Sequence, residues 1–126
     1  MPTYQSDYVR GRGAVTTAHS AITATTTSTA IDLTGYTGAL VECAVTAITS
    51  GNWVCELTGN LTNVGTFGSI FQFDGATSQA TNKPLTAALN ANGVYVYYFT
   101  GLPAFVKVVA TRTTDGTLTC RVQPIR

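Results

Sequence analysis

Charged side chains are scarce in this sequence. Of 126 residues, 7 are Lys or Arg and 6 are Asp or Glu, together 10%, against about 25% in typical soluble domains. The formal net charge is +1. Nucleic acid and acidic membranes both favour clustered Lys and Arg, so neither is expected as a partner. Because so little charge protects a surface only weakly against association, we expect neighbouring subunits to cover much of it. A Thr-rich monomer kept soluble by hydroxyl groups is the alternative.

Long apolar runs are also missing. No stretch approaches the roughly 20 apolar residues that a membrane-spanning helix needs. The N-terminal segment, MPTYQSDYVRGRG, is polar and lacks the apolar middle of a secretory signal. We therefore expect the protein to fold in a cytosol and to have no membrane partner.

Cysteine and histidine are few, which limits metal and nucleophile chemistry. The chain has three cysteines, Cys43, Cys55 and Cys120, and one histidine, His19. Zinc needs four close ligands, and no local pattern supports a Cys–His nucleophile pair. An odd number of cysteines fits a reducing compartment better than a disulfide framework. All three fall at apolar positions of predicted strands, so we interpret them as buried packing residues. A distorted Cys43–Cys55 disulfide and a reactive thiol are the alternatives.

Other catalytic patterns are equally sparse. The six carboxylates are scattered along the chain, and the segment GRGAVTT lacks the spacing of a phosphate-binding loop. We therefore predict that the protein is not an enzyme, with no catalytic residues, no cofactor and no metal site.

What the sequence does contain is period-two alternation rich in Thr, Val, Tyr and Phe, interrupted by Gly, Asn and Asp. We expect one domain, an all-β β-sandwich or jelly-roll-like fold over residues 13–126, preceded by an extended N-terminal arm over residues 1–12. The predicted strands are residues 13–20, 22–33, 39–48, 53–59, 66–73, 85–89, 94–100, 104–113 and 117–124.

Two hairpins can be predicted with a register, because a hairpin must bring the apolar faces of its two strands together. The first would place Val45 opposite Cys55, with Gly51 at positive φ in a bulged three-residue turn. The second would use the same kind of turn at an Asp-Gly pair and place Ala110 opposite Cys120.

The first dozen residues form a candidate binding arm. In an extended chain, side chains two residues apart point to the same side, which would align an aromatic and basic strip. A terminal segment folded back on its own domain is the alternative. The arm residues predicted to contact a partner are Tyr4, Tyr8, Arg10 and Arg12.

A second candidate interface is the segment VYVYYF, residues 94–99. Its two faces are both apolar, as expected for a strand covered by the core on one side and by a partner on the other. A central strand with an irregular outer face is the alternative. We predict the aromatic side, Tyr95, Tyr97 and Phe99, as protein-interface residues. The opposite side carries Val94, Val96 and Tyr98.

Three segments carry a resemblance to a known class of proteins: IDLTGYTGALVECAVTAI, NWVCELTGN and GLPAFVKVVATRTTDGTLTCRVQPI. Over about residues 31–126 the chain resembles the small β-rich structural proteins of tailed bacteriophages, and most closely the capsid decoration, or cement, proteins. The resemblance lies in the general residue pattern of the segments and in the order of the strands. It implies a β-sandwich that forms a homotrimer on the outside of a phage head and bridges neighbouring major capsid proteins with an extended terminal arm.

The function expected from the sequence is therefore structural: a virion protein on the capsid exterior, made in the host cytoplasm, that stabilises the head. Two alternatives remain open. One is a phage tail or fibre adaptor, and the other is a carbohydrate-binding β-sandwich module that would use tyrosines and Trp53 to stack on sugars.

Overall fold

The computed structural model describes residues 11–71 and 83–126. Within these residues the elements are all β-strands, and the predicted all-β sandwich is confirmed. The strands are β1 (Thr16–Ile22), β2 (Thr26–Thr27), β3 (Ile31–Asp32), β4 (Gly38–Thr46), β5 (Asn52–Asn60), β6 (Gly68–Ser69), β7 (Gly93–Thr100), β8 (Phe105–Thr113) and β9 (Thr117–Ile125).

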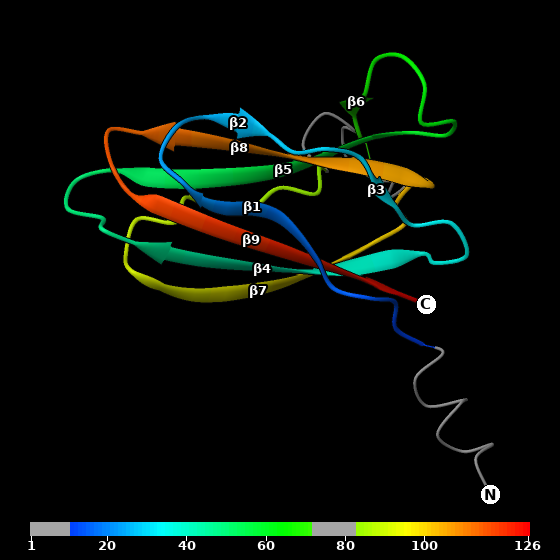
Figure 1. Cartoon of the computed structure of the whole chain (residues 1–126), viewed down its shortest axis with the longest axis horizontal. Helices are drawn as coiled ribbons and strands as arrows, with labels where there is room; N and C mark the ends of the chain where they lie inside the picture. Colours follow the sequence, from blue (N-terminus) through cyan, green and yellow to red (C-terminus); the bar gives the residue numbers. More distant parts are fainter. Residues whose placement is uncertain (1–10, 72–82) are drawn as a thin grey trace, which may run out of the picture.

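Two antiparallel sheets form the layers of the sandwich (Figure 1). The first sheet has the strand order β1-β9-β4-β7. The second has the order β2-β8-β5-β6, and β3 also pairs with β8. Each long central strand buries alternate residues, as period-two patterning requires. The core between the sheets includes Ala39, Val41, Cys43, Val45, Cys55, Leu57, Val106 and Val108.

Both predicted hairpins are wrong. β4 pairs with β7 and β9, while β5 pairs with β8 and β6, so neither predicted pair of strands shares a ladder. The connections from β4 to β5 and from β8 to β9 carry the chain from one sheet to the other. Alternation requires only that two apolar faces meet. Two strands stacked across the core meet that requirement as well as two strands side by side do.

The predicted reason for Gly51 is also wrong, because Gly51 is not among the glycines with positive φ. A Cβ at Gly51 would lie 2.2 Å from the carbonyl oxygen of Thr113 and 2.4 Å from the backbone nitrogen of Asp115. Gly51 is needed for this close approach of two backbones. Gly116, in the other connection, does adopt a positive φ of 113°.

Asp115 ties these two connections together. Its carboxylate accepts hydrogen bonds from the backbone N–H groups of Thr49 (3.2 Å), Ser50 (3.3 Å) and Gly51 (2.9 Å), and also from the Thr49 hydroxyl. One side chain therefore fixes the turn between β4 and β5 against the turn between β8 and β9.

Three of the predicted strands are much shorter in the structure. The segment 22–33 holds the last residue of β1 and the two-residue strands β2 and β3, and the described part of the segment 66–73 holds β6 alone. The segment 85–89 contacts β5 through two isolated bridges, from Leu85 to Glu56 and from Leu89 to Trp53.

The predicted N-terminal arm falls largely outside the described residues. Where the description begins, the chain already lies beside the end of β9: the backbone N–H of Arg126 donates to the carbonyl oxygen of Gly11 at 2.9 Å, and Arg12 forms a bridge with Ile125. Gly11 and Arg12 are thus attached to the first sheet.

Candidate interaction surface

The three cysteines meet in the core, as predicted for packing residues. Cys43 and Cys120 are directly opposite each other on β4 and β9, and the Sγ of Cys55 approaches the Sγ of Cys43 to 3.9 Å from the second sheet. Hydrogen bonding with Cys120, and then with Cys55, lowers the pKa of the Cys43 thiol. The pKa of the Cys120 thiol is raised, first by its contact with Cys43 and then by its contact with Cys55 and by burial. All three are at most 3% exposed, which leaves no surface at which a substrate could react.

His19 is buried as well, at 3% exposure. Its Nε2–H donates to the backbone carbonyl of Val108 at 2.9 Å, so it links β1 in the first sheet to β8 in the second. Across residues 11–71 and 83–126, no three Cys, His, Asp or Glu side chains form a group that could hold a metal ion. In the same described segments, no helix has the length and apolarity needed to cross a bilayer.

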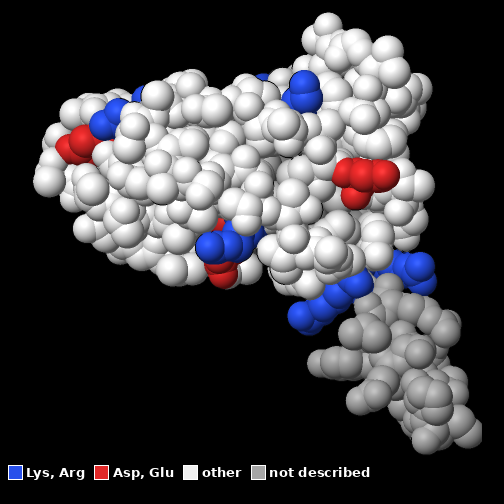
Figure 2. Space-filling view, in the orientation of Figure 1, with Lys and Arg blue, Asp and Glu red and all other residues white. Residues whose placement is uncertain are grey.

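The molecule's exterior offers a different kind of site. Charged side chains are sparse and scattered across the face seen in Figure 2, which is otherwise uncharged. The outward side of the first sheet carries several large apolar side chains beside a few polar ones. We call this surface the outer face, and its residues are Val15, Leu40, Glu42, Val94, Val96, Tyr98, Arg121 and Gln123.

β7 supplies the most exposed part of the outer face. Val94, Val96 and Tyr98 are 65%, 60% and 56% exposed. Because alternate residues of a strand point to opposite sides, the residues between them turn inward. Three consecutive outward positions of β7 are therefore apolar and open to solvent. Single exposed apolar residues are normal on a protein surface, but a contiguous row of them is typical of an interaction site.

The register of the sheet places one ion pair in the middle of this apolar surface. Glu42 on β4 lies directly between Val96 on β7 and Arg121 on β9. The Arg121 Nη1 donates to the Glu42 Oε1 at 3.1 Å, and the two side chains are 46% and 41% exposed. Such an exposed pair contributes at most about 1 kcal/mol to stability. Its main effect here is to neutralise the only charges of the outer face.

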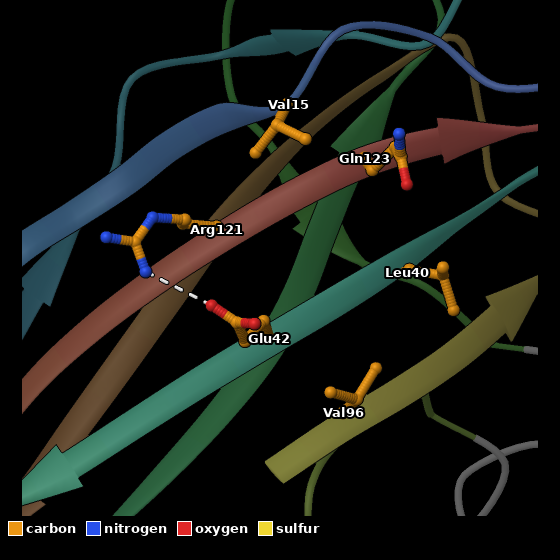
Figure 3. A pocket seen from close by; sticks show the side chains of 6 residues that line it. All are labelled: Val15, Leu40, Glu42, Val96, Arg121 and Gln123. Carbon is orange, nitrogen blue, oxygen red and sulfur yellow. Dashed lines mark hydrogen bonds and ion pairs between the residues drawn. The ribbon is translucent and has the colours of Figure 1, made fainter. Parts of the chain in front are cut away.

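Residues from four strand regions enclose a groove of about 240 Å³ on this face (Figure 3). Val15, Leu40 and Val96 form its apolar walls, and the ion pair closes one side. Binding sites for drug-sized molecules are usually larger, about 300–1,000 Å³, and bury most of the ligand. The groove suits one apolar side chain of a protein partner.

The structure places the predicted interface residues in three different settings. Tyr4, Tyr8 and Arg10 lie outside the described residues. Arg12 is exposed at the end of the first sheet, beside Ile125.

Tyr95, Tyr97 and Phe99 lie on the inner side of β7, half-buried and packed against the core. The rings of Tyr97 and Phe99 stack with centroids 6.1 Å apart, and the Tyr95 hydroxyl donates to the carbonyl oxygen of Ala91. Burial raises the pKa of Tyr97. The side of β7 that was predicted to face a partner therefore faces the core. Aromatic rings bury more apolar area than valine does, which explains why the aromatic side of β7, rather than the valine side, faces the core.

The sequence signal for the outward side was present in the same segment. Val94, Val96 and Tyr98 alternate with the aromatic residues, and nothing in the pattern says which side faces inward. Leu40 and Val15 carry no comparable signal, because their neighbours in space come from other strands.

Trp53 is fully buried, at 0% exposure, beside Gly116. Its predicted alternative role as a platform for sugars is therefore wrong.

Comparisons with protein-family models, curated protein sequences and solved structures return no match to this chain.

Proposed function

We propose that this protein is a structural virion protein of a tailed bacteriophage that binds the exterior of the capsid and stabilises the head by bridging major capsid proteins. The observation that carries the proposal is the outer face, a contiguous, solvent-exposed apolar surface on a rigid sheet. Its two charged side chains, Glu42 and Arg121, neutralise each other. The sequence resemblance described above supplies the virion setting.

On this proposal the protein works through binding energy alone. Burying apolar surface contributes about 25 cal/mol per Å², and a standard protein interface buries about 800 Å² on each partner. A single contact of this kind is moderate in strength. Repetition of the contact by the symmetry of a shell adds up to a large resistance to expansion or rupture.

The outer face can be tested with one charged substitution in the groove. Leu40→Lys places an ammonium group where an apolar side chain of the partner would lie, and we expect at least a tenfold loss of affinity for purified expanded heads. Val64→Lys is the matched control, because Val64 is 76% exposed and is not part of the outer face. The measurement is the bound fraction after sedimentation with heads, with circular dichroism to verify that both variants fold.

Equal occupancy of Leu40→Lys and Val64→Lys would exclude the outer face as the docking surface. Binding of the unaltered protein to purified tails but not to heads would support the tail or fibre adaptor instead.

Deleting residues 2–10, which leaves the attachment of Gly11 and Arg12 intact, tests the arm proposed from Tyr4, Tyr8 and Arg10. Unchanged occupancy after this deletion would refute a role for the arm.

A further inference from the structure

The sandwich protects nearly all of its sheet edges, which matters because an open edge strand offers a row of unpaired backbone groups to another strand. β1, at one edge of the first sheet, is interrupted by two register shifts against β9. In the second sheet, β2, β3 and β6 are two residues long. Bulges and very short strands are both established ways of preventing edge-to-edge pairing.

β7 is the exception. It occupies the other edge of the first sheet, and within the described part of the chain its ladder partner is β4 alone. The pairing with β4 runs from Gly93 to Thr100 without a register shift. The strand, GVYVYYFT, contains no charged residue and no proline. It therefore has none of the bulges, charged residues or prolines that make an edge strand unfit for pairing.

We propose that β7 is a self-association strand, which pairs antiparallel with β7 of a second copy around a twofold axis at Val96. In this arrangement Val96 lies opposite Val96 of the other copy, and Val94 lies opposite Tyr98. The two first sheets then join into one continuous sheet across the axis.

The side chains of β7 match themselves in this register. An antiparallel pair with a twofold axis normal to the sheet keeps outward side chains with outward ones, because directly opposite residues share a face. Centring the axis on Val96 places each of the exposed residues Val94, Val96 and Tyr98 opposite another of the three. Shifting the axis to Tyr97 would set Val94 against Thr100 instead. Of these two registers, only the one at Val96 pairs all three exposed outward residues with one another.

The inner side favours a second copy as well. In the same register, half-buried Tyr95 lies opposite Tyr97 of the other copy and Tyr97 opposite its Tyr95, while Phe99 lies opposite Gly93. Aromatic pairs directly opposite each other stabilise neighbouring strands. With no charge on the strand, nothing repels an identical copy, and nothing selects a charged partner in its place.

This pairing is independent of the proposed function and is measurable on the purified protein. If that function holds, pairing doubles the outer face presented by one particle, because the outward sides of both copies lie on the same side of the joined sheet. It also differs from the threefold assembly implied by the sequence resemblance, so the mass in solution separates the two.

A cysteine placed on the twofold axis tests the register directly. In the pair, the two Val96 Cβ atoms are about 4.5–5.5 Å apart, close to disulfide geometry. We expect Val96→Cys to form a covalent dimer in more than half of the chains on mild oxidation with copper phenanthroline, as seen on a non-reducing gel. The unaltered chain is the control, since its three thiols are buried.

Two neighbouring variants act as register controls. Val94→Cys alone and Tyr98→Cys alone should give little covalent dimer, because the equivalent atoms of the two copies would be about 13 Å apart along the strand. An equal mixture of the two should cross-link. Equal cross-linking of all three single variants would overturn the register.

Light scattering of the unaltered protein gives the second measurement. We expect a dimer mass at 100 µM that falls to the monomer mass for Val96→Lys, with the circular dichroism spectrum unchanged. A monomer or a trimer mass for the unaltered protein would overturn the proposal. So would a dimer mass that persists in Val96→Lys.

Discussion

At the residue scale, the connections between the sheets depend on backbone approach that only glycine permits. At Gly51 the clash that a side chain would cause is with the backbone of Thr113 and Asp115, which cannot rotate away as a flexible side chain can. We expect Gly51→Ala to lower the free energy of unfolding by about 2–3 kcal/mol. Urea denaturation followed by tryptophan fluorescence measures this change, because Trp53 is in the core.

Gly68 provides a matched control for the same substitution. It lies in β6, and a Cβ at this position would meet nothing within 4 Å. Gly68→Ala should change the free energy of unfolding by no more than about 0.5 kcal/mol. Similar losses for both variants would show that the close approach at Gly51 does not determine its residue type.

Asp115 makes the fold sensitive to acid. The Thr49 hydroxyl, the Thr49 N–H and the N–H groups of Ser50 and Gly51 lower the pKa of Asp115 to about 2. A carboxyl group whose folded pKa lies below its unfolded value, about 3.9, stabilises the folded state fully above that value. The contribution is lost as the pH falls towards 2.

We therefore expect Asp115→Asn to be less stable than the unaltered protein at pH 7 and to lose less stability between pH 5 and pH 2. Urea unfolding at each pH measures both effects. Asp32→Asn is the comparison variant: Thr34, in the same turn, also lowers the pKa of Asp32, but within residues 11–71 and 83–126 that carboxylate joins no distant segments. An identical pH dependence in Asp115→Asn and the unaltered protein would contradict this account.

At the scale of the elements, the strands themselves could be predicted from the sequence but their partners could not. β4 and β5 match the predicted segments 39–48 and 53–59 to within two residues, because each alternates apolar and polar residues over its length. The same alternation is satisfied by a hairpin or by a crossing between sheets. The choice depends on backbone contacts at Gly51 and Asp115, which are distant in sequence.

The order of the strands predicts an order of local stability. Amides of β4 and β9, which lie inside the first sheet, should exchange hydrogen at least a thousandfold more slowly than those of β2 and β6, which are two residues long. Hydrogen exchange followed by NMR measures this. Fast hydrogen exchange in β4 would contradict the strand order. Pairing of β7 would slow the hydrogen exchange of the β7 amides as the protein concentration rises.

At the scale of the whole molecule, the small number of charges bears on the proposed binding to phage heads. With a formal net charge of +1 and its outer-face ion pair satisfied internally, binding to a shell should depend on apolar burial. We expect the affinity for heads to change less than about threefold between 50 and 500 mM NaCl, since salt screens mainly exposed charges. Sedimentation with heads at several salt concentrations measures this. A tenfold or greater loss would indicate an electrostatic interface.

The sequence by itself determined that this chain forms strands of alternating apolar and polar residues, buries its three thiols and has few charged side chains, because periodicity and composition are local properties. Only the tertiary structure decided which strands share a sheet and which side of residues 94–99 faces outward. Those outcomes depend on contacts between residues far apart in the chain. The outer face exists because β4, β7 and β9 come together, and no single segment of the sequence contains it.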